Sequence, residues 1–219
     1  MKFNKDLIVF IHIPRTSGTY IEGKLCLKYN CKNKWPNPNI DNLFGLYKIN
    51  DNNYLTLQHL TLNEMIKYKF INKNIDGQYI FTVIRNPYDR VISLYKNWFN
   101  KYKTLDLFLD ELEKLGLDDY QHNGIITKNK FFNYLNMTSK LADIKYFTLP
   151  QYYYIINNED YKVNIIKYDE IETLNKILKL NLKFKPNKEI SKNVLTESQK
   201  NKIYNIYKID FDKFNFTKY

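Results

Sequence analysis

A basic turn that carries several hydroxyl groups lies near the start of the chain and could bind phosphate. The apolar, β-branched run Leu7–Ile13 ends at Pro14, and the residues that follow are Arg15, Thr16, Ser17, Gly18, Thr19 and Tyr20. A loop between a strand and a helix directs backbone N–H groups and the positive end of a helix dipole toward an anion. Gly18 also lets the backbone approach a phosphate closely. We predict an anion-binding loop here, and an ordinary strand–helix turn with a threonine cap is the alternative.

A second basic turn follows the same order of elements. The run Gln78–Ile84 indicates a strand, Arg85 stands at its carboxyl end, and Pro87 suits the first turn of a helix. Ser93 lies about two helical turns further on. Ligands gather at the carboxyl ends of strands in open α/β sheets, and the planar fork of arginine can donate two parallel bonds to a phosphate. Two such sites in one chain predict a ligand with two separated phosphates.

Histidine is the side chain that could move a proton at neutral pH, because its ordinary pKa is about 6.5. The chain contains three histidines, at positions 12, 59 and 122. His59 lies between the two basic turns, but a single histidine is more often structural, so spacing alone leaves both roles open. His12, before Ile13 and Pro14, is placed to point into the sheet. His122 has the surroundings of a loop residue.

Together these segments resemble the sulfotransferases that use 3′-phosphoadenylyl sulfate (PAPS), most closely the carbohydrate O-sulfotransferases of the heparan sulfate 6-O and 2-O type. Pro14–Thr19 resembles the 5′-phosphosulfate loop of that family, and Arg85–Arg90 with Ser93 resembles its 3′-phosphate motif. The resemblance implies His59 as the catalytic base and Arg15 as a second catalytic residue. It implies that the cofactor is bound by Arg15, Thr16, Ser17, Gly18, Thr19, Tyr20, Arg85, Ser93, Lys192 and Asn193. For Lys192 and Asn193, a solvated loop is the alternative.

The chain departs from the family pattern at Arg15, where lysine is usual. Arginine keeps the positive charge, but it is effectively never deprotonated and so cannot readily give a proton to a leaving group. It can still stabilise negative charge that develops there. We therefore expect slow sulfuryl transfer, and a relative that only binds the nucleotide is the alternative.

The resemblance implies a PAPS-dependent O-sulfotransferase that needs no metal ion. The expected partner is a hydroxyl-bearing acceptor. A glycan is the preferred acceptor, and a protein tyrosine or a small alcohol is the alternative. A P-loop nucleotide kinase is a rival from another class, because Gly18–Leu25 nearly matches the Walker pattern, although Leu25 replaces the magnesium-binding hydroxyl. A non-catalytic module that binds nucleotides or polyanions is the third hypothesis.

The elements that must position these residues alternate between strands and helices. This order predicts a P-loop-like, three-layer α/β fold with a central parallel sheet flanked by helices. We expect strands at Leu7–Ile13, Tyr54–Gln58, Gln78–Ile84 and Val163–Lys167, and a long loop over Asn30–Asn53. We expect helices at Thr19–Tyr29, from Thr61 or Asn63 to Lys69, from Pro87 onward, and at Leu105–Leu115, Lys130–Leu135, Gln151–Ile156, Tyr168–Leu178 and Glu197–Ile209.

Composition fits a single sulfotransferase-like domain over residues 1–219. The hydrophobic fraction of 44% and the charged fraction of 26% are ordinary for a globular protein. The net charge of +11 favours anionic partners, but the lysines are spread along the chain, which argues against nucleic acid. Cys26 and Cys31 are too few for a disulfide framework, so free thiols are expected. Without an apparent signal peptide or transmembrane segment, a cytoplasmic location is expected.

Overall fold

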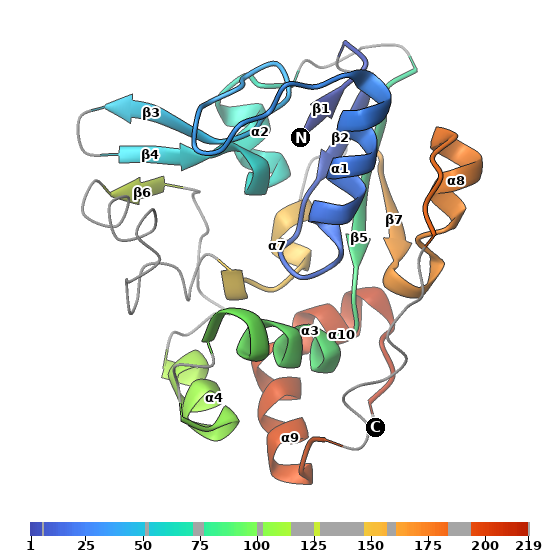
Figure 1. The fold of residues 1–219 in the computed structure, drawn as a ribbon. Helices are drawn as coiled ribbons and strands as arrows, with labels where there is room; N and C mark the ends of the chain where they lie inside the picture. The colour runs from blue at the N-terminus through green and yellow to red at the C-terminus, as the bar shows by residue number, and fades with distance from the viewer. Residues whose placement is uncertain are drawn as a thin grey trace.

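A four-stranded sheet forms the middle of the fold (Figure 1). The computed structural model describes residues 1–5, 7–50, 53–71, 77–99, 103–114, 125–127, 147–156, 161–183 and 194–218. The strands lie in the order β1 (Lys2–Phe3), β2 (Ile8–Ile11), β5 (Tyr79–Ile84) and β7 (Val163–Lys167). Strands β2, β5 and β7 are parallel, and β1 is an antiparallel edge strand. The expected parallel sheet is therefore confirmed for its three main strands.

Helices cover both faces of this sheet, because successive strand residues point to opposite sides and both sides are apolar. Phe10 and Phe81 pack against α1 (Gly18–Tyr29) and α8 (Thr173–Leu178). Val9 and Ile80 pack on the other side, against α2 (Leu62–Lys67) and α7 (Tyr152–Ile155). Within the described ranges, no helix is both long enough and apolar enough to cross a membrane.

A layer of helices lies across the carboxyl ends of the strands, at the bottom of Figure 1. It has its own apolar cluster, to which each of its helices contributes buried side chains. Helix α3 begins at Pro87, whose fixed φ suits the first turn, and Asn86 caps it by accepting a bond from the N–H of Tyr88. The helices of this layer are α3 (Pro87–Leu94), α4 (Leu105–Lys114), α9 (Glu197–Ile206) and α10 (Lys208–Phe214).

A second, antiparallel sheet corrects two expectations. It consists of β3 (Leu46–Asn50), β4 (Asn53–Thr56) and β6 (Ile125–Thr127). The stretch Asn30–Asn53 is therefore not all loop: asparagine favours turns, but the ladder bonds between β3 and β4 hold the flanking residues extended. The expected strand Tyr54–Gln58 is also too long, because the 3₁₀ turn η1 (Leu57–His59) follows Thr56.

Two expected helices are interrupted. Tyr168–Leu178 is a 3₁₀ turn, η3 (Tyr168–Glu170), followed by α8. Glu197–Ile209 is split into α9 and α10 at Tyr207, a buried residue whose hydroxyl donates to the carbonyl of Thr148 at 2.8 Å. That tertiary bond is invisible in the local pattern. The expected helix Lys130–Leu135 lies outside the described residues.

The buried side chain of Arg90 joins the helical layer to the loop that follows β2. It is 1% exposed, and its Nε donates to the carbonyl of Pro14 at 3.1 Å. Its two terminal nitrogens each donate at 3.0 Å, one to the carbonyl of Leu149 and the other to that of Phe147. The negative charge of Asp210, which is fully buried in α10, interacts with this guanidinium. Arg90 therefore connects three segments that are distant in the sequence.

We predict that Arg90→Met lowers the free energy of unfolding by about 3–5 kcal/mol, because it leaves Asp210 as an uncompensated buried charge and unpairs three carbonyl groups. Urea unfolding measures the change. The matched control is Lys208→Met, which removes a side chain that is 61% exposed and should leave the unfolding midpoint within error. A loss below about 1 kcal/mol for Arg90→Met would contradict this account of how the segments are held.

Candidate active site

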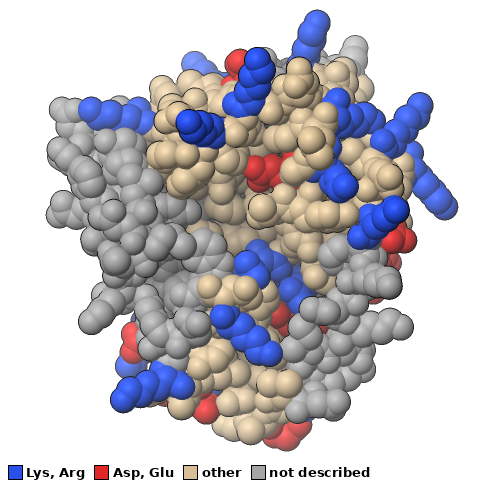
Figure 2. All heavy atoms as spheres, viewed as in Figure 1, with Lys and Arg blue, Asp and Glu red and all other residues tan. Residues whose placement is uncertain are grey.

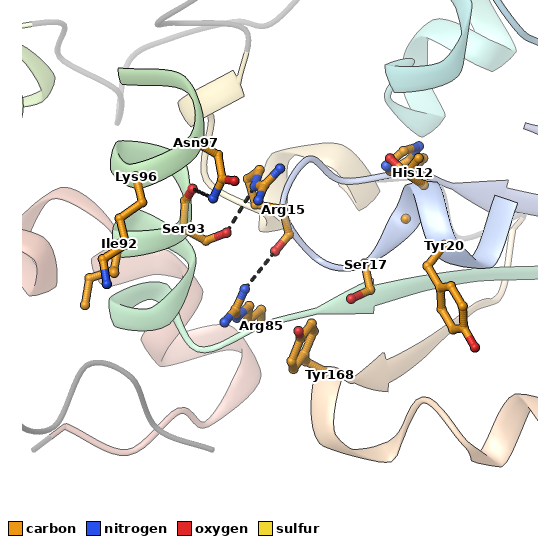
Figure 3. Close-up of a pocket in the computed structure, with 12 residues that line it drawn as sticks. His12, Arg15, Ser17, Tyr20, Arg85, Ile92, Ser93, Lys96, Asn97 and Tyr168 are labelled. Atoms are coloured by element: carbon orange, nitrogen blue, oxygen red, sulfur yellow. Dashed lines mark hydrogen bonds between the residues drawn. The ribbon is translucent and has the colours of Figure 1, made fainter. Parts of the chain in front are cut away.

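A cavity of about 620 Å³ lies between the carboxyl ends of β2 and β5 and the helical layer (Figure 3). It brings together seven residues predicted from the sequence, namely Arg15, Ser17, Gly18, Thr19, Tyr20, Arg85 and Ser93. Its other lining residues are His12, Ile92, Lys96, Asn97 and Tyr168, so no acidic side chain is among the described residues that line it. Figure 2 shows Lys and Arg side chains in the hollow at the centre of this face. The cavity is suited to an anion.

The loop after β2 has a strained backbone. Arg15 and Ser17 both have left-handed torsions, with φ of 70° and 67°. Residues other than glycine rarely adopt this conformation, and such strain is concentrated at functional sites. The loop leads directly into the N-terminus of α1, where the first N–H groups of a helix lack partners within the helix. The predicted arrangement of a loop and a helix N-terminus facing a common space is present.

Gly18 and Thr16 have roles in the loop that the sequence did not reveal. A Cβ atom at Gly18 would lie 1.8 Å from Cδ2 of His12, so any other residue would displace that imidazole. Thr16 is fully buried, and its hydroxyl donates to the carbonyl of Ile13 at 2.9 Å. Thr16 therefore braces the loop and does not line the cavity.

The two basic turns meet at the cavity. Nε of Arg15 donates to the hydroxyl of Ser93 at 3.1 Å, and Nη1 of Arg85 donates to the carbonyl of Arg15 at 3.4 Å. The guanidinium of Arg85 also lies over the ring of Tyr168, 4.3 Å from its centroid. Nε of Arg85 is buried and has no hydrogen-bond partner among the described residues. Burial and the positive charge of Arg85 lower the pKa of Arg15. An anion bound between the two guanidinium groups would therefore stabilise both positive charges.

Gln151 holds the backbone of Arg85 in place. Its side-chain oxygen accepts from the N–H of Arg85, and its side-chain nitrogen donates to the carbonyl of Arg85, both at 2.8 Å. Asp210 accepts from the backbone N–H of Gln151 at 2.9 Å. Burial raises the pKa of Asp210, although Arg90 and these N–H donors act in the opposite direction. The position of Arg85 thus depends on a fully buried polar network.

His59 lies at the end of η1, behind His12, and does not line the cavity. Its Nδ1 lies 3.0 Å from the backbone carbonyl of His12, and a carbonyl only accepts, so Nδ1 carries the proton and Nε2 of the neutral ring carries a lone pair. Burial lowers the pKa of both histidines to about 3, which makes them neutral but weakly basic. A bound anion would raise these pKa values.

Several lining residues were missed by the sequence analysis. Tyr168 follows the carboxyl end of β7, so the strand-end rule that indicated Arg85 could have found it. Lys96 and Asn97 lie on the π-helical turn η2 (Tyr95–Phe99) that continues α3, and sequence patterns do not reveal such turns.

The remaining predicted residues, Lys192 and Asn193, lie outside the described residues. Cys26 and Cys31 are free thiols. Where the structure is described, no three His, Cys, Asp or Glu side chains are grouped so as to hold a metal ion.

Comparison with known proteins gives one match. A model of the Sulfotransferase family matches residues 2–171, a range that includes the loop after β2, His59, Arg85 and Ser93. No curated protein and no solved structure matches the chain. Because the match covers well over half of the sequence, the chain belongs to the sulfotransferase family.

Proposed function

We propose that this protein transfers a sulfuryl group from PAPS to the hydroxyl group of an acceptor. The observation that carries the proposal is the meeting of the two predicted anion sites at one cavity, with Arg15 bonded to Ser93 and Arg85 bonded to the backbone of Arg15. A ligand with two separated phosphates needs such a pair of sites. Family membership supplies the reaction class.

The residues present fit such a nucleotide. In our proposal, Arg85 and Ser93, which both line the cavity, hold the 3′-phosphate. The 5′-phosphosulfate lies at the loop after β2, which is the P-loop-like part of the fold, beside Ser17, Gly18 and Thr19. The hydroxyl of Tyr20 is bonded to the backbone of Lys183, which fixes the Tyr20 ring at the cavity wall. Lys192 and Asn193 remain proposed members of this site.

The proposed reaction uses His59 as the base. Nε2 of His59 lies 3.4 Å from the side-chain amide nitrogen of Gln58, and His59 is not among the described residues that line the cavity, so the proposal requires the acceptor hydroxyl to reach it. Nε2 then takes the proton of that hydroxyl, and the oxygen attacks sulfur. The bond from sulfur to the phosphate oxygen breaks, and its electrons leave with adenosine 3′,5′-bisphosphate. Arg15 and the N–H groups at the start of α1 stabilise the charge that develops on the leaving phosphate. A glycan hydroxyl is the proposed acceptor, because the place of His59 between the two motifs resembles the glycan enzymes.

The kinase hypothesis gains no support from the local structure. Gly23 and Lys24 lie inside α1 and not in the loop before it, and Leu25 is buried in the core. The Walker pattern therefore does not form a phosphate cradle with its own glycines.

We predict that the protein binds adenosine 3′,5′-bisphosphate more tightly than ATP, as measured by calorimetry. Arg85→Met should weaken bisphosphate binding by about 10–150-fold, because a charge-assisted hydrogen bond contributes roughly 1.5–3 kcal/mol. Lys24→Met is the matched control on α1: it should leave bisphosphate binding unchanged, whereas a kinase would lose ATP binding. Tighter binding of ATP, or full affinity in Arg85→Met, would contradict the proposed cofactor.

We also predict that His59→Ala lowers kcat for transfer of radiolabelled sulfate from PAPS to a glycan panel by about 10²–10⁴-fold, because the base is lost. Arg15→Ala should lower kcat through the loss of charge stabilisation. Arg15→Lys should raise kcat above wild type, because lysine can also donate a proton to the leaving phosphate. If His59→Ala and Arg15→Ala both leave transfer intact, this mechanism is wrong.

A further inference from the structure

A buried carboxylate lies next to the two histidines, and the proposed reaction gives it no role. Glu22 is on α1, is 8% exposed, and places Oε2 3.3 Å from Nδ1 of His12. The ring of His12 meets the ring of His59 edge-on, with 4.5 Å between their centroids. The three side chains form a continuous buried cluster that reaches the cavity at His12.

The start of α1 is built around the His12 ring. Gly18 and Glu22 are four residues apart, so they lie on one face of the helix. The imidazole of His12 fills the space that a side chain at Gly18 would need, and its Nδ1 faces Glu22. This arrangement holds His12, whose backbone carbonyl in turn fixes Nδ1 of His59.

The ring of His12 has a buried nitrogen, Nδ1, without a hydrogen-bond partner among the described residues. Leaving such a group unsatisfied costs free energy, which protonation beside a carboxylate would recover. The carboxylate of Glu22, 3.3 Å from this nitrogen, would stabilise positive charge on the neighbouring imidazole rings.

We infer that Glu22 and His12 are positioning residues for the His59 base. The inference rests on the proposed function. When the acceptor hydroxyl gives its proton to Nε2 of His59, the electrons of the O–H bond stay on the oxygen and His59 becomes an imidazolium. The carboxylate of Glu22 stabilises that charge through space, and the carbonyl of His12 keeps accepting from Nδ1. No proton passes to Glu22.

The charged and titratable groups around Glu22 come from several elements. They are His12, His59, the amino group of Met1, and the thiols of Cys26 and Cys31, with Arg15 facing His12. Burial raises the pKa of Glu22, while His59 and the Met1 amino group lower it. Since Met1, Cys26 and Cys31 are the same in every variant below, a change on altering Glu22 reports on the cluster.

The test is an NMR titration of the imidazole groups with saturating adenosine 3′,5′-bisphosphate. The chain has only three histidines, so each can be followed, and His122 is an internal reference. Glu22→Gln should lower the pKa of His59 by about one unit, because a nearby negative charge is removed. The matched control is Glu64→Gln, which alters another buried glutamate that caps α2 through Thr61. It should leave the pKa of His59 unchanged.

Kinetics supply the second readout. Glu22→Gln should lower kcat about tenfold and move the acid limb of the kcat–pH profile to lower pH, because His59 becomes a weaker base. Glu22→Asp, which keeps the charge, should restore most of the activity. Affinity for the bisphosphate should not fall.

An unchanged His59 pKa, or a lower kcat with an unmoved acid limb, would overturn the inference. Absence of sulfate transfer in the wild type would instead defeat the proposed function, and the titration would still test the link between Glu22 and His59.

Discussion

The arrangement of the site depends on the guanidinium of Arg90. Its three hydrogen bonds to backbone carbonyl groups tie the loop after β2 to α3 and to the segment before α7. A loop with two left-handed residues has no strong conformational preference of its own, so tertiary bonds must hold it. Because Arg90 and Ser93 are on the same helix, the bond to Pro14 that fixes the loop also fixes its distance from the proposed 3′-phosphate site. The spacing of the two proposed phosphate sites is thus fixed by the fold itself.

This preorganisation brings together groups that would be more stable apart. Arg15 and Arg85 share one cavity, which His12 also lines, and His59 lies next to His12. Burial lowers the pKa values of both histidines. The positive charges of Arg15 and Arg85 repel each other, and an anion bound between them would stabilise both. Stabilising interactions elsewhere in the molecule offset the cost of placing these groups together. Arg90 and Asp210 carry opposite charges within the core, and apolar clusters cover both faces of the sheet.

The sequence was informative where a site is local. Arg85 could be predicted because the sequence shows both the end of a strand and the proline that starts the next helix. Ser93 could be predicted because its motif resembles the 3′-phosphate motif of the family. The sequence carries no indication of contacts that join segments distant from one another along the chain. The bond from Arg90 to Phe147 and the break at Tyr207 are of this kind. The β3–β4 hairpin was hidden for another reason, because its asparagines indicate turns while cross-strand pairing decides the structure. His12 was noted, but its neighbour Glu22 gave no local signal.

The arginine that replaces the usual lysine has a structural reason in this chain. Its Nε donates to Ser93, which leaves the terminal nitrogens of the fork available to the cavity. A lysine has a single nitrogen and could not both bind Ser93 along its stem and present separate donors at its tip. Arg15 therefore links the two phosphate motifs at the expense of a proton that lysine could donate. In the proposed reaction, the leaving phosphate would depend on fixed charge alone, and more of the barrier would have to be lowered at the acceptor oxygen. In that proposal, the carboxylate of Glu22 meets this demand, since it would strengthen His59 as a base and is not among the described residues that line the cavity.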